Sequence, residues 1–170
     1  MTQKTVKIFR AQEDTTEILR ETVKNAELHG KQRIFVKPNI SHPEYVPGVV
    51  TNPTLISELI CLLRDDNKEV IVGESNGYNY PCRVAFKKTG IETAVKKAGG
   101  TVINLSEDKV VKVKFQSGHS PVKELFLPKT VLDADVVVDM ALMKSSSSFS
   151  FVCLLLPLHF RHSSFDALPI

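Results

Sequence analysis

Residues 33–53, which read RIFVKPNISHPEYVPGVVTNP, combine a short apolar run, a proline-rich loop and a helix start. Ile34–Val36 is too short for a helix and is bounded by proline, so it is expected to be a buried strand. The prolines of the loop fix their own φ angles, which makes the loop stiff. Thr51 or Asn52 is expected to cap a helix whose first residue is Pro53. This succession is typical of a small-molecule site in α/β proteins.

Short apolar runs and amphipathic segments alternate along the rest of the chain. Strands are expected at 5–9, 69–73, 101–105 and 134–138, and helices at 13–28, 53–65, 83–89 and 91–98. The alternating segment 109–115, a turn and the segment 122–127 predict an antiparallel hairpin. The pattern therefore predicts an α/β fold with a mostly parallel, doubly wound (Rossmann-like) sheet, helices on both faces and one added hairpin.

Composition excludes several classes of function. With 24 % charged residues, 42 % apolar residues and a net charge of +3, the chain is typical of a globular protein. It has no basic run and no basic patch interleaved with aromatic residues, so we expect no nucleic-acid partner. The most apolar stretch, 149–156, is far short of the roughly 20 residues that span a bilayer, so no membrane partner is expected. The N-terminus lacks the apolar core of a signal peptide, which favours a cytoplasmic location.

The three cysteines, Cys61, Cys82 and Cys153, are far apart and form no Cys-x-x-Cys pair. We therefore expect no iron–sulphur cluster on this chain. Cys82, which follows a proline, is expected to be a structural thiol.

The composition changes after Lys144. Four serines at 145–148 lead into apolar sequence with neither a helical nor a strand period. We expect residues 1–144 to form the α/β domain and residues 145–170 to be an atypical tail. Such a tail is typical of a frameshift, an altered exon or a truncation, and in that case the sheet is truncated; the alternative is an unusual but genuine tail.

Polar side chains cluster where three of the expected strands end. They are Lys37, Asn39, Ser41 and His42 after the strand at 34–36, Glu74, Ser75 and Asn76 after the strand at 69–73, and Asp139 and Lys144 at or beyond the end of the strand at 134–138. The carboxyl ends of parallel strands meet at one edge of a sheet, where ligands bind. We therefore interpret this edge as the candidate site.

Two of these residues carry the candidate chemistry. Lys37 is a point charge suited to a carboxylate or phosphate, and Glu74 is suited to work as a general base or as a ligand of a divalent cation. Asn39, Ser41, His42, Ser75, Asn76 and Lys144 are candidate ligand-binding residues. Each has a structural alternative: Lys37 can be an exposed strand end or pair with Glu74, and Asn39 can close a local turn.

Several familiar catalytic signatures are absent from the sequence. It contains no Ser-His-Asp order, no His-Glu-x-x-His pair, no phosphate-binding loop and no Gly-x-Gly-x-x-Gly. The residues therefore predict where a site lies but leave open whether the chain is an enzyme.

Several short motifs follow one another along the chain. They are Val36-Lys37-Pro38-Asn39, Pro47-Gly48, Thr51-Asn52-Pro53, Val70 to Ser75, Thr89-Gly90-Ile91 and Ala134 to Asp139. Over Val6 to Lys144 the chain resembles the domain of unknown function 362 family. The resemblance implies an α/β core; some members also carry a ferredoxin-like module, and their activity is not established. The family's usual histidine-containing continuation is missing after Lys144, which implies that this chain holds half of a site.

These observations support competing hypotheses. The first is an α/β domain that binds a small anionic ligand, with or without a divalent cation, through Lys37, Asn39 and Glu74. The second is a non-catalytic fragment that acts by self-association or through a partner chain covering an exposed sheet edge. The third, borrowed from the ferredoxin-fused relatives, is a redox accessory protein, and the missing cluster cysteines count against it.

Overall fold

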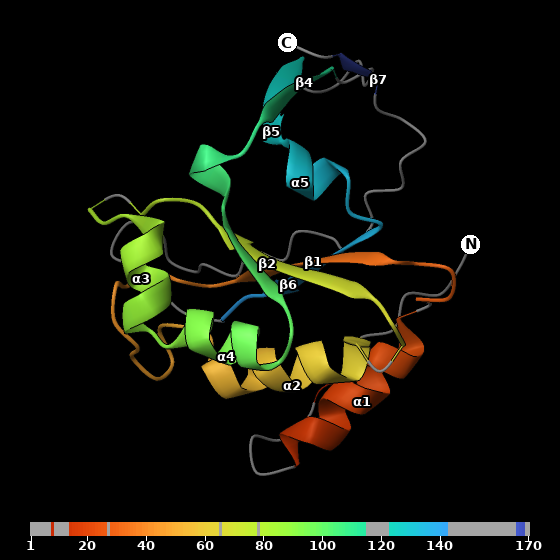
Figure 1. Ribbon diagram of the computed structural model, residues 1–170, viewed down its shortest axis with the longest axis vertical. Helices are drawn as coiled ribbons and strands as arrows, with labels where there is room; N and C mark the ends of the chain where they lie inside the picture. The colour runs from red at the N-terminus through yellow and green to blue at the C-terminus, as the bar shows by residue number, and fades with distance from the viewer. Residues whose placement is uncertain are drawn as a thin grey trace.

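The computed structural model (Figure 1) describes residues 8, 14–26, 28–64, 66–77, 79–114, 123–142 and 166–168. Its helices are α1 (Thr15–Asn25), α2 (Pro53–Arg64), α3 (Cys82–Lys88), α4 (Ile91–Lys97), the one-turn α5 (Lys129–Leu132) and the 3-10 turn η1 (Leu105–Glu107). Its strands are β1 (Arg33–Pro38), β2 (Glu69–Glu74), β3 (Thr101–Asn104), β4 (Val110–Lys114), β5 (Glu124–Pro128), β6 (Val136–Met140) and β7 (Asp166–Leu168).

Four strands form a parallel sheet in the order β3-β2-β1-β6. β1 lies inside the sheet and is almost inaccessible, since Ile34, Phe35 and Val36 are at most 1 % exposed. The chain runs outward from β1 to β2 and β3, and then returns to the other side of β1 to form β6. The strand order therefore reverses between β1 and β6, and the crevice between their carboxyl ends is the topological switch point of the sheet.

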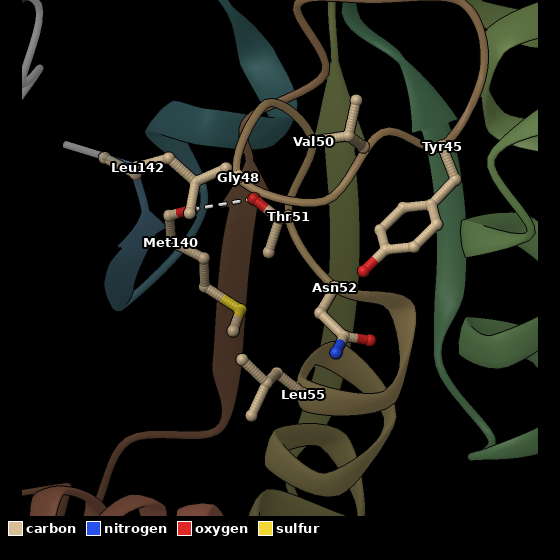
Figure 2. A pocket seen from close by; sticks show the side chains of 9 residues that line it. Tyr45, Gly48, Val50, Thr51, Asn52, Leu55, Met140 and Leu142 are labelled. Atoms are coloured by element: carbon tan, nitrogen blue, oxygen red, sulfur yellow. Dashed lines mark hydrogen bonds between the residues drawn. The ribbon is translucent and has the colours of Figure 1, made fainter. Parts of the chain in front are cut away.

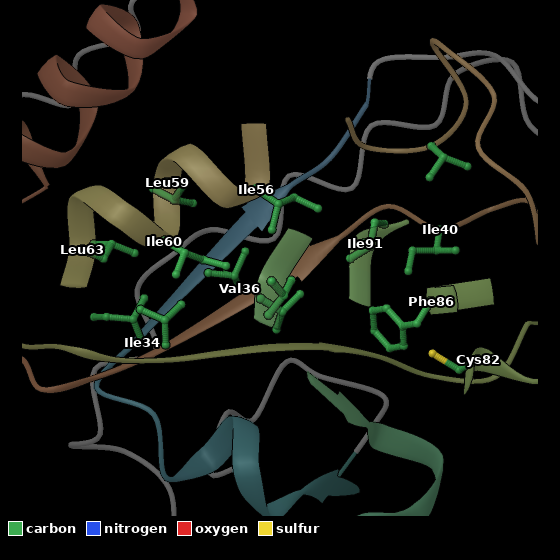
Figure 3. Packing of buried hydrophobic residues seen from close by; sticks show 14 of the residues in the cluster. Ile34, Val36, Ile40, Ile56, Leu59, Ile60, Leu63, Cys82, Phe86 and Ile91 are labelled. Carbon is green, nitrogen blue, oxygen red and sulfur yellow. The ribbon is translucent and has the colours of Figure 1, made fainter. Parts of the chain in front are cut away.

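One face of the sheet packs on α2, α3 and α4, with α1 against α2 (Figure 1). Ile34, Val36, Val70 and Val72 point from the sheet into this core. The helices contribute Ile56, Leu59, Ile60, Leu63, Ala85, Phe86, Ile91 and Val95, most of which lie beside the sheet residues in Figure 3. Burial of this continuous apolar layer is the main stabilising term of the domain.

The opposite face carries α5 and the β4–β5 hairpin (Figure 1). The predicted α/β fold, mostly parallel with one antiparallel hairpin, is therefore confirmed. The sequence pattern predicted a layer of helices on this second face, but α5 and the hairpin lie there instead. The chain between β3 and β6 consists largely of the hairpin, and its alternating residues suit a strand with one exposed side better than a helix.

Local signals explain where α1 and α2 begin. The Asn52 side chain accepts a hydrogen bond from the Thr54 backbone N–H at 2.9 Å, so Asn52 is the cap of α2 and Pro53 is its first residue. Asp14 caps α1 in the same way at 2.9 Å from the Thr16 N–H. The segment 13–28 was expected to be helical throughout, but α1 ends at Asn25.

Three elements were not anticipated from the sequence. The 3-10 turn η1 follows β3 directly. The segment expected to be a plain connector after the hairpin forms α5 at Lys129–Leu132. β7 pairs antiparallel with β4 and makes the hairpin into a three-stranded sheet in the order β5-β4-β7. Apart from Ile8, the strand expected at 5–9 lies outside the described residues, as do Lys144, Cys153 and residues 149–156.

Candidate functional site

Lys37 and Glu74 meet at the carboxyl ends of β1 and β2. The Lys37 Nζ donates to Glu74 Oε2 at 3.0 Å, and the two side chains are 29 % and 13 % exposed. The other carboxylate oxygen, Oε1, accepts from the Ser75 backbone N–H at 2.9 Å and from the Ser75 hydroxyl at 3.4 Å. Both oxygens of Glu74 are therefore engaged, and its carboxylate is held in one orientation.

Lys37 retains donor capacity beyond this ion pair. An ammonium group has three N–H donors. One is directed to Glu74, and a second makes a long contact of 3.5 Å with the Pro38 carbonyl. Among the described residues, Nζ makes no third hydrogen bond.

A second carboxylate shares the face of Lys37. Asp139 of β6 is the in-register partner of Lys37, and cross-strand partners lie on the same face of a sheet. On the other side of Lys37 is Gly73, whose missing side chain leaves space for the Phe35 ring. A Cβ at Gly73 would lie 2.5 Å from that ring. Lys37 therefore forms an ion pair with Glu74 and lies on the same face of the sheet as Asp139.

The loop after β1 uses its own polar side chains to fold. Asn39 Nδ2 donates to the Val49 carbonyl at 2.6 Å, and the Ser41 hydroxyl donates to the same oxygen at 2.9 Å. An isolated antiparallel bridge between Ile40 and Val50 closes the loop. Asn39 and Ser41, both candidate ligand-binding residues, thus lie close together at the expected edge, but these hydrogen bonds are internal to the loop.

Thr51 joins the loop to β6. Its hydroxyl donates to the Met140 carbonyl at 2.8 Å and accepts from the Asn39 backbone N–H at 2.8 Å, and the residue is 3 % exposed. Sequence reasoning identified Thr51 only as a helix-cap candidate. It is instead the residue that fastens the ends of β1 and β6 to each other at the switch point.

The remaining predicted residues lie apart from the Lys37–Glu74 pair. His42 is exposed, and its Nδ1 lies 3.1 Å from both the backbone nitrogen and the carbonyl oxygen of Glu44. Asn76 faces α3 and β3, where its Oδ1 accepts from the Cys82 N–H at 2.9 Å and from Asn104 Nδ2 at 3.2 Å. Lys144 is not among the described residues.

Asn104 and Glu107 extend this second network. Asn104 is 7 % exposed, and its Nδ2 also donates to Glu107 Oε1 at 2.8 Å. Glu107 forms an ion pair with Arg83. The hydrogen bonds from Arg83 and then from Asn104 lower the pKa of Glu107 to about 2. These groups hold the loop after β2 against η1 and the start of α3.

Burial makes the Cys82 thiol unreactive. Cys82 is 1 % exposed, and its Sγ–H points to the Glu74 carbonyl at 3.3 Å. Burial, followed by the negative charges of Glu74 and Glu107, raises its pKa to about 12. A thiol that stays protonated at neutral pH is a poor nucleophile, so the structure agrees with a structural role for this cysteine.

Tyr80 connects the loops that follow β1 and β2. Its hydroxyl donates to the Ile40 carbonyl at 2.8 Å, and its ring covers Gly77, where a Cβ would lie 2.4 Å from the ring. Burial, with the charge of Glu74, raises the pKa of Tyr80. Nothing in the local sequence pattern pointed to this contact, because it joins residues 40 positions apart.

A hollow of about 310 Å³ lies at the switch point (Figure 2). It is bordered by the loop after β1, the start of α2 and the end of β6. Its lining consists of Tyr45, Gly48, Val50, Thr51, Asn52, Leu55, Met140, Ala141 and Leu142. A larger hollow of about 600 Å³ lies between α2 and α4.

No group of three or more His, Cys, Asp or Glu residues with the arrangement of a metal site occurs in the part of the chain that the structure describes. Within the same residues, no helix is both long and apolar enough to cross a membrane.

The chain matches a protein-family model. The family model described as "Domain of unknown function (DUF362)" matches residues 34–153, which extend from the second residue of β1 past the end of β6. No curated protein and no solved structure matches the chain. Since the matched residues make up most of the sequence and include both strands that supply Lys37 and Glu74, the chain belongs to the DUF362 family.

Proposed function

We propose that this chain binds a small anionic ligand at the carboxyl ends of its parallel strands, with Lys37 as the group that holds the anion. The observation that supports this proposal is the ammonium group of Lys37, which lies partly buried at the carboxyl ends of β1 and β2 and makes only two hydrogen bonds with the described residues. Ligands of doubly wound sheets bind at this edge. Glu74 has the role of fixing the ammonium group in position, and Ser75 in turn fixes Glu74.

The charges around Lys37 select among anions. Lys37 is paired with the carboxylate of Glu74 and shares a sheet face with that of Asp139, so these three side chains taken together are not cationic. A dianion such as phosphate would meet more repulsion there than a monoanion. The ligand that fits best is therefore a monocarboxylate, which needs one charge-assisted hydrogen bond from Lys37.

The proposal also includes a divalent cation bound by Glu74. Carboxylate oxygens are the ligands that Mg²⁺ prefers, and a cation held between Glu74 and the ligand would offset the repulsion that a dianion meets. We therefore expect Mg²⁺ to strengthen phosphate binding more than carboxylate binding. The proposed contacts to Asn39, Ser41, His42, Asn76 and Lys144 are secondary, since the hydrogen bonds of the first four serve the loops themselves.

Titration followed by amide NMR shifts tests the proposal. The full chain is titrated with acetate and with inorganic phosphate, each with and without Mg²⁺. Acetate should shift the amides of Gly73 and Ser75, and the shifts should disappear in the double variant Lys37→Met/Glu74→Gln. The double variant removes both charges together and so avoids leaving Glu74 unpaired. If acetate shifts these amides equally in the double variant and in the unaltered chain, Lys37 does not bind the anion.

A second candidate function rests on a different observation. Leu125 and Phe126 of β5 are 41 % and 56 % exposed, and within the described residues β5 and β6 each pair along one edge only. Exposed apolar strands are typical of surfaces that pair with another chain. Light scattering during size-exclusion chromatography distinguishes the two cases. A mass above that of one chain, reduced by Phe126→Ser, would favour action through a second copy.

A further inference from the structure

We infer that β6 pairs antiparallel with the β6 of a second copy of this chain, along the edge that has no neighbouring strand among the described residues. A two-fold axis at Val138 would relate the two copies and join their parallel sheets into one continuous sheet. This inference deepens the second candidate function, because it names the edge and the register through which two copies would meet.

β6 has the exposure and the sequence of an edge strand that can accept a partner. All five of its residues are half-buried, whereas Ile34, Phe35 and Val36 of β1, which has a strand on each side, are at most 1 % exposed. Natural edge strands often avoid pairing through lysine, proline or a bulge. β6 reads VVVDM and pairs with β1 over consecutive residues, so it contains none of the three.

Alternate residues of β6 direct their backbone groups to the open edge. The Asp135 N–H, just before the strand, donates to the Arg33 carbonyl at 2.9 Å, so the backbone groups of Asp135 face β1. Successive residues of a strand direct their N–H and C=O groups to alternate sides. The backbone N–H groups of Val136, Val138 and Met140 therefore point away from β1, toward the position of an added strand.

A two-fold axis at Val138 brings these backbone groups face to face. Val138 would lie opposite Val138 of the second copy, and the two residues would exchange both backbone hydrogen bonds. Val136 would lie opposite Met140 of the second copy, whose N–H would donate to the Val136 carbonyl. The Met140 carbonyl already accepts from Thr51, and this register does not depend on it.

The carboxylates favour this register over the two nearest ones that keep the helix-bearing faces on one side. With the axis at Val138, Asp139 lies opposite Val137 of the other copy. With the axis at Val137, Asp139 would lie opposite Asp135, and with the axis at Asp139 the two Asp139 side chains would lie opposite each other. Like charges directly opposite destabilise a strand pair. The axis at Val138 therefore avoids opposed carboxylates.

β5 offers a less suitable edge than β6. It ends at Pro128, which has no N–H to donate, and it begins at Glu124, whose carboxylate pairs with Lys112 at 2.8 Å. The Lys112 ammonium group also lies 5.8 Å from the centroid of the Phe126 ring, so this exposed ring has a partner within the hairpin. Charge and proline are features that oppose edge pairing, and β5 has both.

Pairing through β6 would keep the two proposed anion sites apart. The strands of the second copy run in the opposite direction, so their carboxyl ends lie at the opposite edge of the joined sheet. Lys37 of one copy would therefore be remote from Lys37 of the other. Anion binding and self-association can accordingly be tested separately.

Two matched substitutions at Val137 test the register, with sedimentation velocity of the full chain over a range of concentrations. Both remove the same half-buried valine, so they differ mainly in the charge opposite Asp139 of the second copy. Val137→Asp places like charges opposite each other twice in the dimer, and Val137→Lys places opposite charges there. The dissociation constant of the dimer should be about tenfold higher or more for Val137→Asp than for Val137→Lys. Equal dissociation constants would overturn the inference.

Val138→Pro tests the edge itself. It removes an N–H that points away from β1, and proline is tolerated on an edge strand whose N–H faces solvent. The variant should keep the circular dichroism spectrum of the unaltered chain but sediment as a monomer, and a dimer of unchanged affinity would contradict the inference. In the unaltered chain the Val138 amide should exchange faster on dilution. A Val138 amide protected equally in the monomer would mean that the chain's own residues cover the edge, which would also contradict it.

Phe126→Ser separates this inference from the second candidate function. It should leave the dimer unchanged, because Phe126 lies on β5. A dimer that is lost in Phe126→Ser but kept in Val137→Asp and Val138→Pro would retain the second candidate function and overturn the pairing through β6. A mass of one chain at every concentration would contradict both.

Discussion

Replacing Thr51 by valine should destabilise the domain by about 2–4 kcal/mol. The valine side chain nearly matches threonine in shape but has no hydroxyl, so both hydrogen bonds of 2.8 Å that link Asn39, Thr51 and Met140 are lost. Thr51 is 3 % exposed, so water does not readily replace these bonds. The Asn39 N–H and the Met140 carbonyl would each lose a partner, at a cost of about 1–3 kcal/mol for each group. The apolar valine methyl group is more favourable at this buried site than the hydroxyl it replaces, which offsets a fraction of that cost.

Urea denaturation measures this loss, and hydrogen exchange of the Asn39 amide locates it. The midpoint should fall with an unchanged m-value, and the Asn39 N–H should exchange faster because its acceptor is gone. Thr51→Ser keeps the hydroxyl and should cost no more than about 1 kcal/mol. Thr54→Val, at an exposed position of α2, is the matched control and should stay within about 0.5 kcal/mol. Equal stability and equal amide protection in Thr51→Val would refute the assignment of Thr51 as the link between β1 and β6.

Three further predictions concern other parts of the structure. Gly73→Ala should destabilise the sheet by about 1–3 kcal/mol because the new Cβ would lie 2.5 Å from the Phe35 ring; adding Phe35→Leu should recover part of this loss in urea melts, and no recovery would contradict the clash. The pKa of Glu107 is lowered from 4.5 to about 2, so its stabilising contribution is complete above pH 4.5 and is lost as the pH falls through about 2. The difference in Tm between the unaltered chain and Glu107→Gln should therefore shrink over that interval, and a difference independent of pH would refute the assignment. Iodoacetamide at mildly alkaline pH should label the exposed Cys61 and leave the buried Cys82, whose pKa is raised to about 12, unlabelled until the chain is unfolded; peptide mass spectrometry would show the reverse if Cys82 were a reactive thiol.

The elements of the parallel sheet could be predicted because their signals are local. Val70-Ile71-Val72 and Val136-Val137-Val138 are apolar runs of strand length, and Asn52-Pro53 is a strong start signal for α2. β7 could not be predicted, since a strand of three residues acquires its identity from pairing with Lys112–Lys114 far away in the chain. α5 has a single turn, which is too short for a helical period to appear in the sequence.

The part of the candidate site at the strand ends could be predicted, but the contacts within its loops could not. The contact between Lys37 and Glu74 follows from adjacent parallel strands that end at one edge, which the strand pattern already implies. The hydrogen bonds of Asn39 and Ser41 to the Val49 carbonyl depend on the path of the loop, and loop paths are set by tertiary contacts that the sequence pattern does not display. The same applies to Tyr45 and Met140, which come together only once β6 lies beside β1.

The hydrogen bond from Tyr80 to the Ile40 carbonyl has a consequence for the energetics of ligand capture. It joins the loop that follows β1 to the loop that follows β2, and the Tyr80 ring packs on Gly77. Loops that are already held together lose little conformational entropy when a ligand binds. For the ligand proposed above, more of the contact energy would then be expressed as affinity.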